Sequence, residues 1–556
     1  METLDHYYDT GSYSRPISTD SAEAQAWFDH GLAWAYGFNL EESLDCFRRA
    51  VAADPDCAMA HWGVAYAAGP YYNRQWDRFD ATELPRRLQE THAAAERALA
   101  LGHRATGVER ALVEAMAVRC PSDREPADFT ARTEGYADTM REAWRAFPDD
   151  PDVCTLFADA LMSRTPWMLW DLETGAPRSG ASTLEVREVL ERAISDREAA
   201  GKPAHAGMLH FYIHLMEMSP TPEAALRAGD ELYALARDCG HLQHMATHID
   251  FQCGHYRNVV VRNSAAIARN RKYFERNGAL NLYSYARIHD IHFKLYGALF
   301  LGQYHAAMEA VREFAETVPE ALIRIESPPM ADMLEGYYGL GLHALVRFGR
   351  WREIVAEPLP PDPDLYLVTT AVTHYAKTAA HAALGEVSAA AREKDGFAAA
   401  VARVPSSRTL FNNVWLDIFA IASRMLDGEI EYRRGRHEVA FEHLREAIRL
   451  EDHLPYDEPW GWMQPVRHAL GALLLEQGRV AEAEAVYRED LGFDDRVIRA
   501  RRHPDNVWSL HGLHECLRRG GKHAEAGMIG ARLEIALARA DVPIRSSCFC
   551  RLTHGS

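Results

Sequence analysis

The chain has 556 residues, with 61 Lys and Arg against 80 Asp and Glu, so its formal net charge is −19 at pH 7. This acidity excludes nucleic acid and anionic membrane surfaces as the main partners. Because 556 residues exceed what one compact core accommodates, we expect several domains or a repeat array that grows by stacking.

The pattern of apolar residues predicts an all-α protein. No stretch alternates apolar and polar residues as half-buried strands do. No apolar run is long enough to cross a bilayer, and the N-terminal METLDHYYDTGSY has neither the basic head nor the apolar core of a signal peptide. We therefore expect a soluble, cytoplasmic protein with no membrane partner.

Nine cysteines, an odd number, are scattered along the chain. This distribution predicts reduced or buried thiols rather than a disulfide framework. Cys548 and Cys550 form a local pair in SSCFC near the C-terminus, where we expect exposure.

The first organised segment, residues 24–57, has the spacing of a 34-residue helix-turn-helix unit. Its marker residues are Trp27, Gly31, Trp34, Ser43, Phe47, Ala50 and Pro55. In these residues the chain resembles the tetratricopeptide repeat (TPR) family. The resemblance implies an α-solenoid, or superhelix, that encloses a central groove, with small residues where two helices approach and large ones between successive hairpins.

Repeat quality divides the chain into five segments. They are an N-terminal extension (1–20), degenerate TPR-like helices (21–200), central repeats (201–400), C-terminal repeats (401–540) and a tail with the CFC sequence (541–556). Within the second segment, residues 164–180 predict a long loop that carries Trp167 and Trp170. Such a loop is either a lid or binding loop, or the two tryptophans pack against a helix end.

Histidines recur at equivalent positions of three consecutive central repeats. They are His210 and His214 in one repeat, His241, His244 and His248 in the next, and His289 and His292 in the third. At about 100° per residue these positions share one face of each first helix. In the TPR family this face lines the concave groove, as the resemblance implies, so we expect the seven side chains to point into one cavity.

This spacing predicts a transition-metal site. His210 with His214 and His244 with His248 are i,i+4 pairs, and neighbouring helices pack about 8–10 Å apart, so four imidazoles can surround one ion at about 2 Å. The alternative is a solvated or stacking histidine cluster without a metal.

His241, His289 and His292 can hold a second ion. Imidazole ligands without thiolate favour copper, with iron or zinc as further possibilities, and a surplus of histidines indicates an open, reactive position rather than a closed zinc site. Asp250 and Asp290 point away from the groove face, so we expect them to support the ligands rather than bind the ion.

Other groove positions supply candidate reactive groups. The candidates for a catalytic role are Tyr296, Glu335, Tyr375, His468 and Glu515. His511 is a further candidate metal ligand. If the C-terminal repeats approach the central ones, His468, His511 and Glu515 can complete a metal site or contact a substrate. The alternative is that these three are isolated polar residues of the groove.

The middle of the chain also resembles a group of uncharacterised bacterial TPR proteins with an HFYIH segment followed by an H-M-x-S/T-H-I segment. Here these segments are residues 210–214 and 244–249. The resemblance covers roughly residues 20–530 and implies one long array, but it implies no reaction. Ala246 stands where we expect proline in that group, so the helix start there can differ.

Two classes of function remain, because the sequence holds no phosphate-binding glycine loop, nucleophile elbow or dinucleotide fingerprint. The first is an oxygen-using, metal-dependent oxidoreductase that acts on a small organic substrate in the groove. The second is a peptide-binding or protein-binding scaffold without catalysis. A zinc hydrolase is a further alternative, with Glu217 or Glu335 as base, although no HExxH motif supports it.

Overall fold

The computed structural model describes residues 7–235 and 237–551. In this part of the chain nearly all regular structure is helical, which confirms the predicted all-α class. The described strands are β1 (Thr409–Leu410) and β2 (Asn413–Val414), an antiparallel pair. The outer parts of the predicted N-terminal extension and C-terminal tail, residues 1–6 and 552–556, lie outside the described residues.

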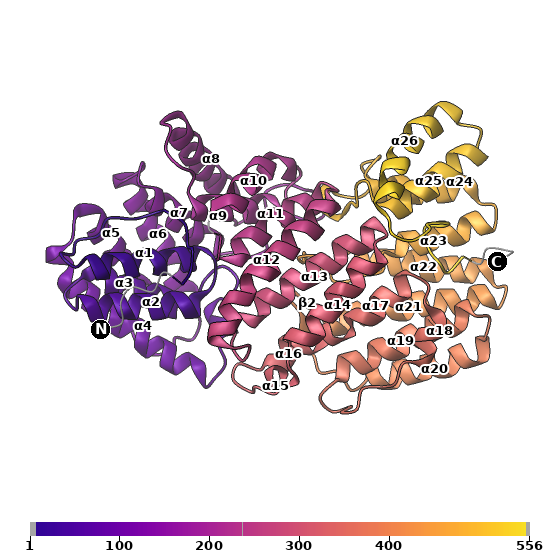
Figure 1. Ribbon diagram of the computed structural model, residues 1–556, viewed down its shortest axis with the longest axis horizontal. Helices are drawn as coiled ribbons and strands as arrows, with labels where there is room; N and C mark the ends of the chain where they lie inside the picture. The colour runs from indigo at the N-terminus through magenta and orange to yellow at the C-terminus, as the bar shows by residue number, and fades with distance from the viewer. Residues whose placement is uncertain (1–6, 236, 552–556) are drawn as a thin grey trace. The chain divides into compact units, whose positions relative to one another are not determined.

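Contacts group the chain into two compact units. The first unit comprises Met1–Ile249 and Ala265–Arg287, and the second comprises Asp250–Ser264 and Ile288–Ser556. The chain passes from one unit to the other within α11, α12 and α13 (Figure 1). The five segments drawn from repeat quality stay a prediction.

The first unit is built from helical hairpins in which successive helices pack together, such as α1 with α2 and α3 with α4. Its elements in chain order are α1 (Ala22–Tyr36), α2 (Leu40–Ala53), α3 (Ala58–Ala68), η1 (Trp76–Arg78), α4 (Glu83–Leu101), η2 (Gly102–Arg104), α5 (Gly107–Arg119), α6 (Thr130–Ala146), α7 (Pro151–Met162), α8 (Thr183–Ala199), α9 (Ala206–Met216), η3 (Pro222–Ala225), α10 (Leu226–Leu235) and parts of α11 (Gly240–Gln252), α12 (Tyr256–Asn277) and α13 (Ser284–Leu301).

The second unit continues with hairpins of the same kind, such as α19 with α20 and α21 with α22. Besides its parts of α11, α12 and α13, it contains α14 (Tyr304–Thr317), α15 (Glu320–Ile323), α16 (Met330–Leu334), η4 (Glu335–Gly339), α17 (Leu340–Arg347), α18 (Trp351–Ala356), α19 (Leu367–Ala383), α20 (Val387–Val401), α21 (Trp415–Arg433), α22 (His437–Asp452), α23 (Val466–Glu476), α24 (Val480–Leu491), η5 (Arg499–Arg501), α25 (Val507–Arg519) and α26 (His523–Arg539).

The hairpin α1–α2 shows why the predicted repeat residues produce this fold. The Ser43 hydroxyl on α2 donates to the Gly31 carbonyl on α1 at 2.7 Å. A Cβ at Gly31 would lie 2.7 Å from the Phe47 ring, and one at Gly63 on α3 would lie 2.2 Å from the same ring. Phe47, which is fully buried, therefore fills a space that exists only because two glycines face it.

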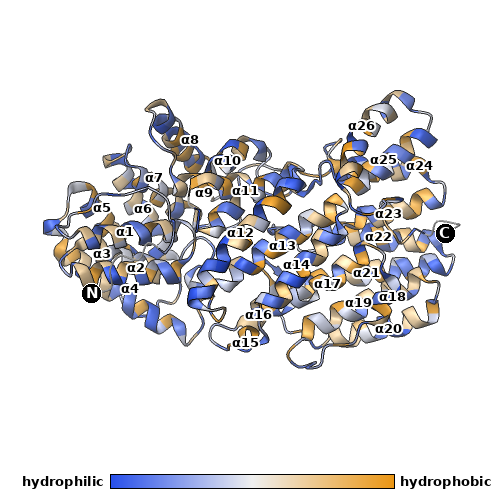
Figure 2. Cartoon of the chain, viewed as in Figure 1, coloured by the Kyte–Doolittle hydropathy of each residue, from blue (hydrophilic) through white to orange (hydrophobic). Residues whose placement is uncertain are grey.

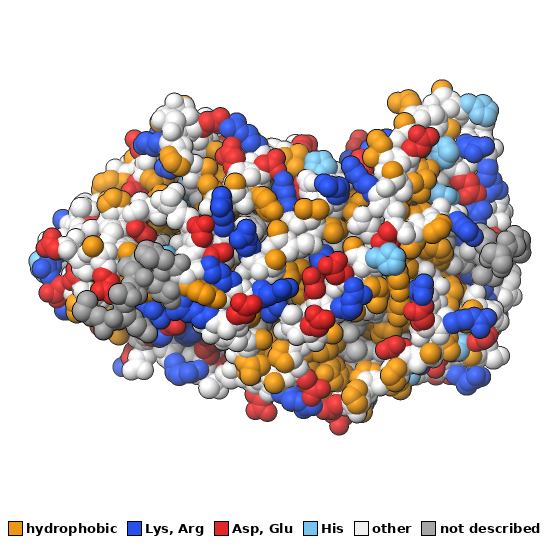
Figure 3. All heavy atoms as spheres, in the orientation of Figure 1, with side chains coloured by type: hydrophobic (Ala, Val, Ile, Leu, Met, Phe, Trp, Pro, Cys, Tyr) orange, Lys and Arg blue, Asp and Glu red, His pale blue; other side chains and the backbone are white. Residues whose placement is uncertain are grey.

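Hydrophilic and hydrophobic residues are mixed along most helices, as Figure 2 shows. Lys, Arg, Asp and Glu side chains are interspersed on the face seen in Figure 3. Among the described residues, no helix combines the length and the apolar character that crossing a bilayer requires.

The cysteines largely follow the sequence-based expectation. Six of the seven free thiols are buried, and Cys253 is half-buried. Cys548 and Cys550, in contrast, form a disulfide with each other, and Cys550 is buried.

The glycine contacts of Phe47 lead to a stability prediction. Gly63→Ala places a methyl group against the Phe47 ring, and we expect the overpacking to destabilise the first unit by about 1–3 kcal/mol. The control is Gly102→Ala, where a Cβ meets nothing within 4 Å. Thermal unfolding followed by circular dichroism should show a lower midpoint for Gly63→Ala alone, and equal midpoints for the two variants would contradict this packing.

Candidate metal centre

Five histidines of the first unit gather in one buried cluster. His210 and His214 come from α9, and His241, His244 and His248 come from α11. Their exposed fractions are 0%, 0%, 4%, 0% and 2% in that order. These five residues are called the five-histidine cluster below.

The five rings follow one another in a closed circuit. The distances between ring centroids are 4.9 Å for His214–His210, 5.1 Å for His210–His241 and 5.6 Å for His241–His244. They are 4.8 Å for His244–His248 and 5.7 Å for His248–His214, which closes the circuit. The histidines of these two helices therefore lie side by side, and their predicted role as metal ligands stays a prediction. His241, which the sequence assigns to a second ion, lies between His210 and His244 in the same circuit.

Two glycines allow the helices that carry the cluster to come close to their neighbours. A Cβ at Gly207, in the first turn of α9, would lie 2.7 Å from Thr155 and 2.9 Å from Tyr36. A Cβ at Gly240, the first residue of α11, would lie 2.3 Å from the Asn270 side chain. Because only glycine fits, α9 packs directly against Tyr36 at the end of α1.

The Glu217 carboxylate joins the two helices. Its Oε1 accepts from His214 Nδ1 at 2.8 Å, and its Oε2 accepts from His248 Nδ1 at 2.6 Å. Glu217 is the C-cap residue of α9 and is fully buried. Because the carboxylate oxygens accept these bonds, the Nδ1 atom of each ring is the donor and Nε2 is the atom left as a possible ligand.

His210 is held in the same tautomer by the backbone. Its Nδ1 donates to the Tyr36 carbonyl at 2.6 Å, which leaves the Nε2 lone pair available. Burial and the neighbouring His214 lower the pKa of His210 well below its usual range, and burial and His210 do the same to the pKa of His241. These rings are therefore neutral, which is the form that binds metals.

Several ring nitrogens of the cluster are buried without a protein partner. Among the described residues, His210 Nε2 and both ring nitrogens of His241 have no hydrogen bond. Buried polar atoms are nearly always satisfied in native proteins, and each exception calls for an explanation such as an ion. Here the exceptions sit together, because one ring nitrogen each of His210, His214 and His241 lie within 4.8 Å of one another.

The nitrogen spacing fits shared coordination. His244 Nε2 and His248 Nε2 are joined by a hydrogen bond of 2.8 Å, which an ion bound to both nitrogens would replace. Two nitrogens bound to one ion at about 2.0–2.1 Å are separated by about 3 Å when the angle between them is near 90°. The pair therefore already stands close to the spacing that two ligands of one ion require.

Aromatic rings close one side of the cluster. The Phe38 ring lies 4.3 Å from His210 and is stacked on His241 at 5.6 Å. Tyr72 lies 5.0 Å from His214, and the Trp167 backbone N–H donates to the Tyr72 hydroxyl at 3.1 Å. Phe38 and Trp167 are non-glycine residues with positive φ, at 55° and 54°. Such backbone strain concentrates at functional sites.

The two tryptophans of the predicted loop 164–180 have different surroundings. Trp170 packs against the end of α9, because it is buried and its indole N–H donates to the Leu215 carbonyl at 2.7 Å. Trp167 instead contributes to the aromatic wall, 6.5 Å from the His214 ring.

A second layer of polar groups supports Tyr36. Its hydroxyl donates a hydrogen bond to Asp152 Oδ1 at 2.6 Å. The same carboxylate accepts hydrogen bonds from the Tyr13 hydroxyl and the Arg15 guanidinium at 2.7 Å each, and lies 3.1 Å from His205 Nε2. Burial alone would raise the pKa of Asp152, but the hydrogen bond and charge of His205 and the charge of Arg15 hold it well below its usual range. The network fixes the backbone that orients His210.

The remaining histidine candidates lie in the second unit. Burial and His343 lower the pKa of His292 to about 3, and among the described residues neither of its ring nitrogens has a hydrogen bond. His289 is buried 5.1 Å from the Phe293 ring and stacks on Phe411. Their predicted role as ligands of a second ion stays a prediction.

The candidate catalytic groups of the second unit have structural partners. Tyr296 donates to the Trp462 carbonyl at 2.9 Å, and Tyr375 packs edge-to-face on the Trp462 ring. Glu335 accepts from the backbone N–H groups of Val368 and Thr369, at 2.9 Å each, at the start of α19.

Two of the three candidates near the C-terminus, His468 and Glu515, likewise have structural partners. Both ring nitrogens of His468 make hydrogen bonds, one to Asp490 at 2.9 Å and one from Arg347 at 2.8 Å. Glu515 pairs with Arg551 at 2.7 Å. Burial lowers the pKa of the half-buried His511, whose role as a metal ligand stays a prediction.

Sequence reasoning missed four parts of this site. The sequence suggests Glu217 only as a possible base, although its i,i+3 spacing from His214 is a usable signal. Phe38, Tyr36 and Tyr72 belong to other repeats, and their sequence positions carry no signal for this role.

Comparisons with protein-family models and with curated proteins find no match. Solved structures that match include one of Naa15/Naa10 bound to HypK-THB, at 14% identity and a TM-score of 0.19 over 93% of this chain and 70% of that chain. Yeast Tom70 matches at 10% identity and a TM-score of 0.28, over 90% of this chain and 96% of that chain. The P58(IPK) TPR domain matches at 12% identity and a TM-score of 0.19, over 82% of this chain and 99% of that chain. Likenesses at this level carry no argument about activity or partners.

Proposed function

We propose that the first unit is a metal-binding protein module in which the five-histidine cluster holds a transition-metal ion. The observation that carries the proposal is the Glu217 carboxylate between His214 Nδ1 and His248 Nδ1. Metal-binding histidines commonly donate their other ring N–H to a carboxylate or a backbone carbonyl, which fixes the tautomer and makes the ligand nitrogen more basic. His210 on the Tyr36 carbonyl supplies the second of these two arrangements.

The ligand type indicates the metal. Imidazole without thiolate suits copper, iron, zinc and nickel, and an array built mainly of histidine with its carboxylate in the outer layer favours copper. Iron and zinc are the other candidates. Five nitrogen ligands exceed the four that a closed zinc site uses, which supports a reactive rather than a purely structural ion.

The burial of the histidines also bears on whether they bind a peptide or a metal. The cluster histidines are at most 4% exposed, so a peptide lying on the surface of the unit does not reach their rings. This weakens the alternative in which the histidines are stacking or pH-sensitive peptide contacts. We therefore propose metal chemistry on a small organic molecule rather than peptide recognition as the role of these residues.

Metal content is the first test. Protein purified without a histidine tag should contain about one equivalent or more of copper, iron or zinc by elemental analysis. His210→Gln and His241→Gln should each lower it, whereas His92→Gln, which changes a half-buried histidine of α4 outside the cluster, should not. A metal-free protein that also fails to bind added Cu²⁺ or Zn²⁺ would exclude the proposal.

Glu217 provides a second test that does not remove a ligand. Glu217→Gln keeps the shape but replaces one accepting oxygen by a donating NH₂, so it no longer accepts from both His214 and His248. We expect metal affinity to fall by about 10–100-fold. Glu191→Gln is the matched control, because Glu191 is an exposed glutamate that accepts from Tyr212 on α9. Equal affinities of the two variants, measured by competition with a chelator, would contradict the role of Glu217.

The reaction that we propose is oxidation of a small organic substrate by dioxygen. The substrate loses two electrons and two protons, which reduce dioxygen to hydrogen peroxide. Metal-loaded protein should then consume oxygen and release peroxide with a suitable substrate from a panel of small phenols, amines and alcohols, and His210→Gln should not. Metal-loaded protein that consumes no oxygen with any substrate while it hydrolyses esters or amides would favour the zinc hydrolase instead.

A further inference from the structure

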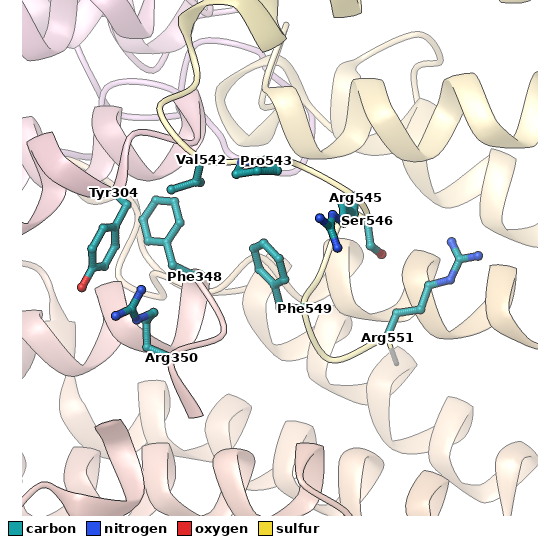
Figure 4. Close-up of a pocket in the computed structure, with 9 residues that line it drawn as sticks. All are labelled: Tyr304, Phe348, Arg350, Val542, Pro543, Arg545, Ser546, Phe549 and Arg551. Atoms are coloured by element: carbon teal, nitrogen blue, oxygen red, sulfur yellow. The ribbon is translucent and has the colours of Figure 1, made fainter. Parts of the chain in front are cut away.

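We propose that the second unit contains a binding site for a small organic anion with an aromatic body, such as an aromatic carboxylate, in a cavity beside the C-terminal segment. The cavity measures about 370 Å³, which lies in the range of about 300–1,000 Å³ typical of small-molecule sites. It is formed by residues from the start of α14, the turn between α17 and α18, and the segment 542–551 (Figure 4). It is separate from the five-histidine cluster, which belongs to the first unit.

The segment that walls the cavity is fastened at both ends. Asp541 accepts from the backbone N–H groups of Tyr304 at 2.6 Å and His305 at 2.9 Å. The Ser547 hydroxyl donates to the His468 carbonyl at 2.9 Å and is 2.6 Å from the Tyr487 hydroxyl. A wall held on both sides is preformed, so a ligand does not have to order it on binding.

Apolar rings line the middle of the cavity. Figure 4 shows Tyr304 and Phe348 on one side and Phe549 on the other, with Val542 and Pro543 on the segment that leads to Phe549. Phe549 is held in place, because its ring packs on Trp508 at 5.8 Å and its Cβ lies 2.8 Å from the position of a Cβ at Gly349. A flat apolar body therefore has rings to contact on both sides.

The charged groups that line the cavity are all cationic. They are Arg350, Arg545 and Arg551, and none of the described residues that line the cavity is acidic. Arg551 is paired with Glu515, and Arg350 is paired with Glu353 while its guanidinium lies over the Tyr304 ring at 5.0 Å. Arg545 is exposed and, within the described residues, has no ion pair, so its guanidinium is the group that can bind an anion.

These features together select the ligand class. A guanidinium binds a carboxylate through two parallel hydrogen bonds, and the rings bind an apolar body. An inorganic anion such as phosphate uses only the first feature, and a neutral aromatic molecule uses only the second. An aromatic carboxylate uses both.

Calorimetric titration of the full chain with 2-naphthoate tests the proposal. We expect binding, and we expect 2-naphthol and inorganic phosphate to bind at least about tenfold more weakly, because each lacks one of the two interactions. Arg545→Gln should lower the affinity for 2-naphthoate by about tenfold or more, and Phe549→Leu should also lower this affinity. Arg352→Gln removes the same charge from an exposed position outside the cavity and should leave binding unchanged.

The outcomes separate the alternatives. Circular dichroism spectra that match the wild type confirm that the variants fold, which is expected because Arg545 is exposed. The proposal would be overturned if 2-naphthoate did not bind in the millimolar range, or if 2-naphthol bound with equal affinity. It would also be overturned if Arg352→Gln lowered the affinity for 2-naphthoate as much as Arg545→Gln does. Phosphate binding as tight as that of 2-naphthoate would overturn the aromatic part of it.

Discussion

The hydrogen bonds between one carboxylate and two imidazoles organise the first unit's centre. Glu217 stands where α9 ends and accepts from a histidine of α9 and a histidine of α11. It thereby fixes the tautomer of both rings and ties the two helices together. A buried carboxylate is stabilised only when its oxygens are satisfied, and these two N–H groups satisfy it. Because these bonds use Nδ1 of His214 and His248, Nε2 of each ring is the atom left as a possible metal ligand.

The surrounding structure extends this arrangement outward. The Tyr36 carbonyl orients His210, and the Tyr36 hydroxyl is held by Asp152, which also binds Arg15 and His205. Each layer orients the one inside it, so the ring positions do not depend on the mobility of a surface loop. Phe38 and Trp167, both with a left-handed backbone, supply the apolar cover. Water exclusion strengthens electrostatic and hydrogen-bonding interactions inside such a site.

The part of this account that the sequence predicted follows from periodicity. His210 and His244 are 34 residues apart, as are His214 and His248, and a repeat of that length places equivalent residues on the same face of equivalent helices. The close approach of α1, α2 and α3 around Phe47 was predictable for the same reason. Glu217 was not, because its role depends on the residue at which α9 ends. The carbonyl of Tyr36 and the turn conformation of Phe38 carry no side-chain pattern, and the partners of His468 and Glu515 depend on contacts between distant segments.

X-ray absorption at the metal edge of copper-loaded full chain tests the central claim most directly, because it reports the atoms bound to the ion. Our account predicts a first shell dominated by nitrogen at about 2.0 Å, with the multiple scattering of three or more imidazole rings. We expect this signal to weaken in His210→Gln and to persist in His92→Gln. A first shell of oxygen without imidazole scattering, or a spectrum unaffected by His210→Gln, would contradict the assignment of the five-histidine cluster as the metal centre.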